Sequence, residues 1–360
     1  LTNCTNTIGQ QITVYPLPTA TIAGTTAVCE DAASPTITFT GAAGTAPYTF
    51  IYNLNGGINQ TVTTTSGNSV IVPVPTGTAG TYTYTLVSVR DASPAACLQA
   101  QTGTAVIIVN PLPTATISGT TSVCRNASSP NITFTGASGT TPFTFTYTIN
   151  GGTSQTVTTT GINISVTLPV STLAAGTFTY TLLSVRDASS TLCSQPQAGS
   201  AVVTVNPLPT ATIGGTTAVC RNAAIPNITF TGADGTAPYT FTYRINSGTN
   251  QTVTSTVGNS ATVPVATGTA GTFTYTLVSV SDATTTTCLQ AQSGSAVVTV
   301  NPLPTATING TIALCKDAAS PVITFAGAGG TAPYTFTYTI NSGSNQTITT
   351  TTGNSVTVPV

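Results

Sequence analysis

The chain has 360 residues, of which only 4% are charged: six Lys or Arg and seven Asp or Glu give a formal net charge of −1, and histidine is absent. Such a chain lacks the basic surface that a phosphate backbone needs, so nucleic-acid binding is excluded as an expected function. Low charge can indicate disorder, but 40% of the residues are hydrophobic, and they alternate with threonine in the two-residue period of half-buried strands. We therefore expect a folded, all-β chain.

An internal repeat organises the sequence. The triplet Pro-Leu-Pro recurs every 95 or 96 residues, which is long enough for each repeat to close a hydrophobic core of its own. The expected segments are the C-terminal end of a preceding repeat (1–15), three complete repeats (16–110, 111–206 and 207–301) and the N-terminal part of a further repeat (302–360). The junction prolines, which should stiffen each linker, are Pro16, Pro18, Pro111, Pro113, Pro207, Pro209, Pro302 and Pro304.

The first complete repeat shows the predicted strands in chain order. They are residues 19–24, 36–41, 47–55, 60–65, 70–74, 81–89 and 104–109, here called A to G. Seven short strands separated by turn residues, with no helical periodicity, are typical of an immunoglobulin-like β-sandwich. We expect a tandem array of such sandwiches, of about 95 residues each, forming an extended rod.

Aromatic residues concentrate in strand C. Tyr48, Phe50, Tyr52 and Leu54 fall on one face of this strand, which predicts core packing rather than a carbohydrate-binding platform. Edge strands need protection against pairing with other chains, and a proline within the last apolar triplet of strand E serves that purpose. These prolines are Pro73, Pro169, Pro264 and Pro359.

Catalytic and metal-binding residues are scarce. The acidic residues are spread so thinly that paired-carboxylate catalysis has no obvious pair, and Ser or Thr without a base is not an activated nucleophile. Asp91, Asp187 and Asp282 follow strand F in the three repeats, where an Asp side chain commonly shapes a turn by accepting backbone N–H bonds. One carboxylate per site is too few for Ca²⁺, and single cysteines without histidine do not suit Zn²⁺. We expect no enzyme activity, no metal and no cofactor.

Eight cysteines take two fixed places in the repeat. Cys29, Cys124, Cys220 and Cys315 lie between strands A and B, whereas Cys4, Cys97, Cys193 and Cys288 lie between F and G. Regular spacing of this kind predicts disulfides. Pairing within a repeat would join Cys29 to Cys97, Cys124 to Cys193 and Cys220 to Cys288.

Pairing between repeats is the alternative, and sandwich geometry favours it. The A to B and F to G connections of a sandwich lie at opposite ends, about a strand length apart, whereas a disulfide needs Cα atoms within about 7 Å. If repeats follow one another end to end, Cys29 pairs with Cys193 and Cys124 with Cys288. Cys4, Cys97, Cys220 and Cys315 are then further disulfide candidates, with partners in other repeats or outside residues 1–360.

The run "GTFTYTLVSVSDATTTTCLQAQSGSAVVTVNPLPTATINGT", at 271–311, resembles the tandem PKD-like and Ig-like repeats of giant Bacteroidetes surface proteins, above all the SprB-type gliding-motility adhesins. The resemblance covers the whole chain, through the Pro-Leu-Pro junction and the two cysteine places. It implies an extracellular cell-surface filament, exported by the type IX secretion machinery and anchored to the outer membrane outside this chain. The Trp and the "DFGDG" segment of many PKD domains are missing.

Two functions remain open at this point. The first is a structural stalk that holds an adhesive tip away from the cell, contacting neighbouring repeats of its own chain while other regions bind an external surface or polysaccharide. The second is a multivalent carbohydrate-binding array, in which every repeat carries a weak site. The F to G loops differ among the copies, as "SPAACLQAQTG", "SSTLCSQPQAG" and "TTTTCLQAQSG", which favours the stalk. No signal peptide, initiator Met or membrane-length apolar run is seen, so we expect targeting and anchoring to lie outside these residues.

Overall fold

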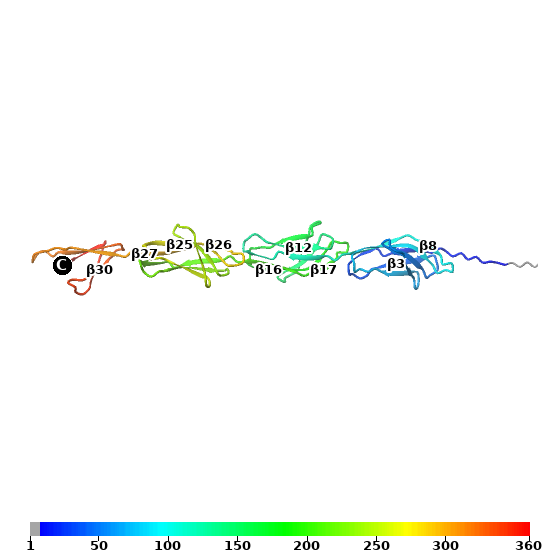
Figure 1. Cartoon of the computed structure of the whole chain (residues 1–360), viewed down its shortest axis with the longest axis horizontal. Coiled ribbons are helices and arrows are strands. Elements are labelled where there is room, and N and C mark those ends of the chain that lie inside the picture. Colours follow the sequence, from blue (N-terminus) through cyan, green and yellow to red (C-terminus); the bar gives the residue numbers. More distant parts are fainter. Residues whose placement is uncertain (1–7) are drawn as a thin grey trace, which may run out of the picture. The chain divides into compact units, whose positions relative to one another are not determined.

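A computed structural model of the protein describes residues 8–360, so Cys4 lies outside the described residues. Strands, turns and loops make up the described part, and none of it is helical (Figure 1). Residues 8–360 accordingly hold no helix of the length and hydropathy that a membrane span requires. The chain divides into two compact units, one of residues up to Thr121 with Ser129–Ser171 and Thr177–Val203, the other of Ser122–Ser128, Thr172–Gly176 and Thr204–Val360.

The first repeat contains two facing sheets built from nine strands. These are β1 (Thr19–Ala23), β2 (Thr26–Cys29), β3 (Thr36–Ala42), β4 (Thr49–Leu54), β5 (Gln60–Thr63), β6 (Ser69–Pro73), β7 (Gly80–Arg90), β8 (Leu98–Ala100) and β9 (Thr104–Asn110). One sheet has the order β1-β3-β6; the other has the order β2-β9-β7-β4-β5, with β8 paired to the end of β7. The strand pairings of this repeat are antiparallel except that of β2 with β9, which is parallel and sets Cys29 beside Asn110.

The second and third repeats copy this arrangement. The second has β10 (Thr114–Ser118), β11 (Thr121–Cys124), β12 (Asn131–Ala137), β13 (Thr144–Ile149), β14 (Gln155–Thr158), β15 (Ser165–Pro169), β16 (Gly176–Arg186), β17 (Ser194–Pro196) and β18 (Ser200–Asn206). The third has β19 (Thr210–Gly214), β20 (Thr217–Cys220), β21 (Asn227–Ala233), β22 (Thr240–Ile245), β23 (Gln251–Thr254), β24 (Ser260–Pro264), β25 (Gly271–Ser281), β26 (Leu289–Ala291) and β27 (Ser295–Asn301). Their sheet orders match those of the first repeat strand for strand.

Residues 302–360 hold the first half of the same pattern. The strands are β28 (Thr305–Asn309), β29 (Val322–Ala328), β30 (Thr335–Tyr338), β31 (Gln346–Thr349) and β32 (Ser355–Pro359). A surface hollow lined by Phe325, Phe336 and Tyr338 opens between these strands. In the first repeat the equivalent aromatic residues, Phe39, Phe50 and Tyr52, are covered by residues of β7 and β9. The hollow is therefore an uncovered part of the core rather than a ligand pocket.

The all-β, immunoglobulin-like sandwich is the fold expected from the sequence, but each complete repeat has nine strands where seven were predicted. The two additional strands in the first repeat are β2 and β8, which have four and three residues. Such short segments show too little alternation to be recognised, and they become strands only by pairing with β9 and β7. Cys29 therefore ends a strand instead of lying in the connection between A and B.

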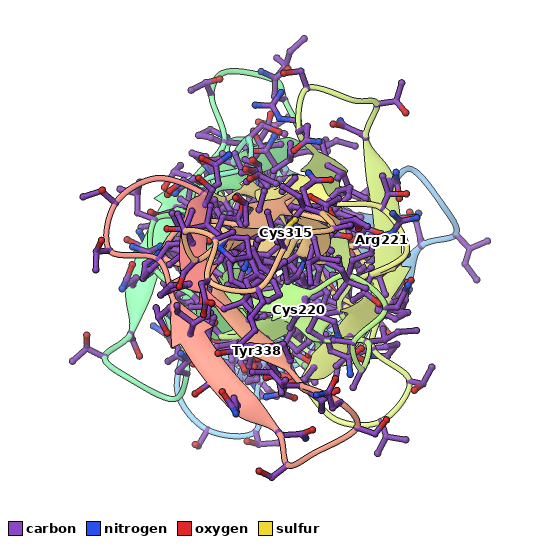
Figure 2. All side chains as sticks on the ribbon, turned by 90° about the vertical axis from the view of Figure 1, so that its left-hand side faces the viewer. Cys220, Arg221, Cys315 and Tyr338 are labelled. Carbon is purple, nitrogen blue, oxygen red and sulfur yellow. A yellow bond between two sulfur atoms is a disulfide. The ribbon has the colours of Figure 1, made fainter. Side chains whose placement is uncertain are left out.

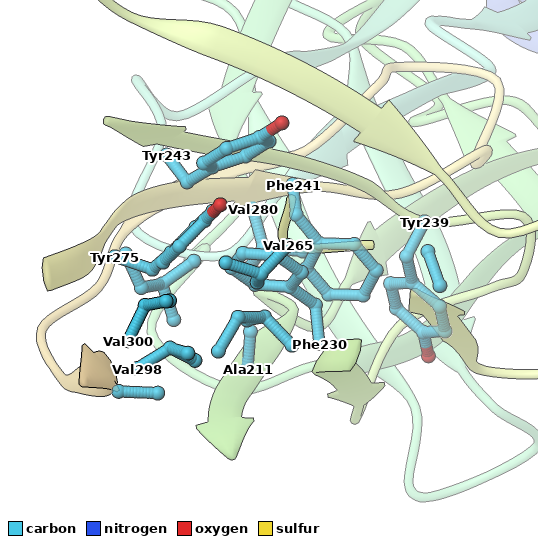
Figure 3. Close-up of a cluster of buried hydrophobic side chains, with 14 residues drawn as sticks. Ala211, Phe230, Tyr239, Phe241, Tyr243, Val265, Tyr275, Val280, Val298 and Val300 are labelled. Atoms are coloured by element: carbon cyan, nitrogen blue, oxygen red, sulfur yellow. The ribbon is translucent and has the colours of Figure 1, made fainter. Parts of the chain in front are cut away.

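The core of each repeat is aromatic, as strand C predicts. In the third repeat, Phe230 from β21 packs against Phe241 and Tyr243 from β22, with ring centroids 5.6 and 5.0 Å apart (Figure 3). Offset and tilted pairs at such distances add to the stabilisation from burial. Every Tyr and Phe of the chain is buried or half-buried, which leaves no exposed aromatic platform.

The edge prolines lie where the sequence placed them. In the first repeat, Pro73 ends β6, an outer strand of the sheet β1-β3-β6, opposite Thr36. Proline has no backbone N–H to donate to another chain, so a proline in an outer strand weakens pairing of that strand with other chains.

Candidate functional site: cysteine junctions between repeats

The loop after β7 presents Cys97, and a buried aspartate holds it in shape. Asp91 is 4% exposed. Its Oδ2 accepts a hydrogen bond from the Thr45 N–H at 3.1 Å, and its Oδ1 accepts bonds from the Cys97 N–H at 2.9 Å and the Ser93 hydroxyl at 2.8 Å. Burial alone would raise the pKa of the Asp91 carboxyl, but the hydrogen bonds from Thr45, Ser93 and Cys97 outweigh it and hold that pKa below its ordinary value.

Asp187 and Asp282 do the same in the next two repeats. Each is buried, and each accepts a backbone bond across the loop, from Thr140 at 3.1 Å and Thr236 at 3.3 Å. The predicted turn-shaping role of the three aspartates is confirmed by these bonds. The loop conformation is thus a property of each repeat, and it brings its cysteine to one end of the sandwich.

The other cysteine place lies at the opposite end of the repeat, where β2 finishes. The Glu30 N–H donates to the Asn110 carbonyl at 2.8 Å, which continues the pairing of β2 with β9. Cys29 is therefore held beside the last residue of the repeat, directly before the Pro-Leu-Pro linker.

Two disulfides join consecutive repeats. Cys29 of the first repeat is bonded to Cys193 of the second, and Cys124 of the second to Cys288 of the third. In both bonds the Cα atoms are 5.6 Å apart and the partners are 164 residues apart in sequence. These are the pairs preferred from sandwich geometry; the alternative pairs within a repeat, such as Cys124 with Cys193, are not formed.

A polar contact accompanies each disulfide. At the first junction, the Asn110 side-chain amide donates to Thr191 Oγ1 at 2.9 Å, and that oxygen lies 3.3 Å from the Cys29 sulfur and 3.1 Å from the Cys193 sulfur. At the second, Asn206 donates to Thr286 Oγ1 at 2.9 Å. The same four groups, namely two sulfurs, one amide and one hydroxyl, therefore lie together at both junctions.

The linker prolines and leucines take up two different environments. Pro18, Pro113 and Pro209 are buried, and the first of these packs beside Gly44, where an added Cβ would come within 3.0 Å of it. Leu112 and Leu208, at the two bonded junctions, are half-buried, whereas Leu17 is 56% and Leu303 48% exposed. The linker leucine is thus covered where two repeats are joined.

Three described cysteines have no disulfide partner. Cys97 is half-buried, while Cys220 and Cys315 are exposed. The last two are labelled in Figure 2. Cys220 ends β20 beside Asn301, in the register that Cys29 and Asn110 have in the first repeat. The surface at Cys220 is therefore built like the two bonded ones.

The arrangement is suited to covalent connection. Within residues 8–360, no three His, Cys, Asp or Glu side chains come close enough to hold a metal ion. The asparagine and threonine of each junction were missed from the sequence, although a signal existed: Asn110, Asn206 and Asn301 each precede Pro-Leu-Pro, and Thr191 and Thr286 each stand two residues before a cysteine.

Comparisons with known proteins give distant likenesses only. No protein-family model and no curated protein matches the chain. Among solved structures, a bacterial ice-binding adhesin is 17% identical, with a TM-score of 0.35 over 80% of this chain and 100% of the other. A tetra-tandem repeat from the extending region of a large adhesion protein is 17% identical, with a TM-score of 0.28 over 95% and 90%. The Escherichia coli adhesin FdeC is 13% identical, with a TM-score of 0.34 over 77% and 97%.

Proposed function

We propose that this chain is a structural segment of a long cell-surface adhesin, a stalk that transmits tension between an anchored end and an adhesive tip. Neighbouring repeats of the same chain are its main partners. Its resemblance to gliding-motility adhesins extends the proposal to type IX secretion, attachment outside this chain and movement along the cell. The tip or other regions would contact the external surface or polysaccharide.

The observation that carries the proposal is the overlap of the two disulfides. The Cys29–Cys193 and Cys124–Cys288 bonds share the chain between residues 124 and 193. Every peptide bond between Cys29 and Cys288 is therefore bypassed by at least one disulfide. When the chain is pulled from its ends, the shortest covalent path uses only residues 1–29, 124–193 and 288–360, so the two disulfides limit the length that unfolding under load can release to roughly half of that of the unbridged chain.

A carbohydrate-binding array has less support. Such a site needs exposed aromatic rings or a recurring polar cluster, and every Tyr and Phe is buried or half-buried. The disulfide, the Asn–Thr bond and the turn-shaping aspartate recur with their contacts and serve connection or loop shape. Hydroxyl pairs across neighbouring strands also recur, such as Thr49 with Thr63 and Thr144 with Thr158, and their hydroxyls are bonded to each other.

A backbone cut tests the proposal. A specific protease site is inserted at the exposed Ala198–Gly199 turn, which only the Cys124–Cys288 bond bypasses. After cutting, we expect one full-size band on a denaturing gel without reductant and two bands with it. A matched cut at the exposed Ser342–Gly343 turn, beyond both disulfides, should release a fragment in either case.

Release of fragments from the Ala198–Gly199 variant without reductant would contradict the covalent path. Binding of the isolated chain to a panel of polysaccharides at micromolar concentration would overturn the stalk in favour of the array. We expect no such binding.

A further inference from the structure

The Asn–Thr contact occupies two recognisable sequence positions. Position one is the residue directly before Pro-Leu-Pro, held by Asn110 and Asn206; position two lies two residues before the cysteine of the next repeat's loop, held by Thr191 and Thr286. The two residues of a pair are 81 or 80 positions apart and come from different repeats.

Both positions change together at the start of the chain. Position one before the first repeat is Tyr15, and position two in that repeat is Ala95. Tyr15 is half-buried, although residues 8–14 before it are all exposed. At this junction the larger Tyr15 stands where the others have asparagine, and the smaller Ala95 stands where the others have threonine.

We infer that these two positions form a matched pair that selects which repeats can be joined. Asn opposite Ala loses the short hydrogen bond from its half-buried amide to the Thr hydroxyl, although Asn206 keeps a longer contact of 3.4 Å with Ser122 Oγ. Tyr opposite Thr must place a ring where a branched side chain already lies. Asn–Thr and Tyr–Ala are complementary, by hydrogen bonding in the first case and by size in the second. Selection of this kind depends on penalties for wrong partners as well as contacts with the right one.

The pair assigns a partner to the exposed surface at the end of the third repeat. Asn301 and Cys220 lie side by side there and are both exposed. They match a repeat that carries a hydroxyl residue two positions before its loop cysteine, and they mismatch the first repeat, which carries Ala95. The inference needs only the junction geometry and stands apart from the proposed stalk.

A double-mutant experiment on the first junction tests the pair. Cys4, Cys97, Cys220 and Cys315 are replaced by Ser in all chains, and Asn110→Tyr, Thr191→Ala and the double variant are equilibrated in glutathione buffers. Trypsin after denaturation cuts at the six Lys and Arg residues, so Cys29–Cys193 appears as peptide 1–90 linked to 187–221, and Cys124–Cys288 as 91–125 linked to 245–316. The second bond is an internal control for folding.

We expect each single variant to lower the equilibrium constant for the Cys29–Cys193 bond about 3- to 10-fold, with the Cys124–Cys288 bond unchanged. The double variant should return to within about 2-fold of the parent, because Tyr–Ala is again a matched pair. Asn206→Tyr with Thr286→Ala should repeat the result at the second junction. Losses that simply multiply in the double variant, or single variants without effect, would overturn the inference.

Discussion

The loops that carry Cys97 and Cys193 have the same shape in different surroundings. Asp91 and Asp187 close them with equivalent bonds, from their own N–H groups to the carbonyls of Cys97 and Cys193 at 3.1 and 2.9 Å. The residues before the cysteines, Ala96 and Leu192, both have positive φ, 45° and 51°. Yet Cys193 is only 1% exposed and bonded to Cys29, whereas Cys97 is half-buried and unpaired.

This difference separates what a repeat determines from what its neighbour determines. The loop is shaped inside the repeat, by the aspartate, before any partner arrives. Burial of the sulfur depends on the neighbouring repeat that carries the other cysteine. A junction therefore joins two preformed surfaces, which reduces the ordering cost of forming the bond.

The largest expected effect comes from removing one disulfide. The Cys29–Cys193 bond closes a loop of 164 residues, and loss of a native disulfide of this kind costs about 2 to 4 kcal/mol in free energy of unfolding. We expect Cys29→Ser to show this loss in the first and second repeats, measured by hydrogen exchange at the strands β7 and β16. Cys97→Ser is the matched control and should change stability by less than about 0.5 kcal/mol.

Removing the aspartate tests whether the loop is independent of the neighbour. Asp187→Ala leaves the Thr140 N–H and the Ser189 hydroxyl without their acceptor, which costs about 2 kcal/mol because the Ser189 hydroxyl is buried. Asp91→Ala should cost the first repeat a similar amount, although Cys97 has no disulfide. A much smaller loss at Asp91, measured by denaturant unfolding, would show that the disulfide contributes to the loop shape.

Acid provides a third test. The pKa of Asp91 lies below its ordinary value in the folded repeat, so the ionised carboxylate adds stability at neutral pH. That contribution is present above the unfolded pKa of about 3.9 and is lost as pH falls through the lower folded value. Asp91→Asn should be less stable than the parent at pH 7, and the difference in free energy of unfolding should narrow as pH falls below the unfolded pKa of about 3.9. A constant gap from pH 7 to pH 2 in equilibrium unfolding would contradict the assignment.

The sequence predicted the strands in which buried and exposed residues alternate. It missed the strands of three or four residues and the contacts between two repeats. Strands such as β7 and β9 are visible because buried residues recur at every second position, and the cysteine pairing follows from the opposite ends of a sandwich. Strand β2 has only four residues and is a strand only because it pairs with β9. Asn110 and Thr191 each recur at a fixed place in the repeat, but they lie 81 positions apart in different repeats, so the sequence does not show that the two side chains meet.

The smallest expected effect concerns a tyrosine at the loop end of the first repeat. The Tyr48 hydroxyl donates to the Gly44 carbonyl at 2.8 Å and accepts from the Gly44 N–H at 3.1 Å, next to the Thr45 that binds Asp91. The second repeat has Phe143 at this position, with its ring equally close to Gly136 as Tyr48 is to Gly41. A ring without the hydroxyl is therefore compatible with the fold.

We expect Tyr48→Phe to cost about 1 kcal/mol, the net contribution of a partly solvated hydrogen bond. Phe143→Tyr should leave the second repeat unchanged or stabilise it by less than that amount, since Gly139 offers the same backbone groups that Gly44 does. Denaturant unfolding of both variants measures the difference. A loss above about 3 kcal/mol for Tyr48→Phe would mean that the hydroxyl, and not only the aspartate, holds the loop end in the first repeat. The two loops would then owe their common shape to different bonds.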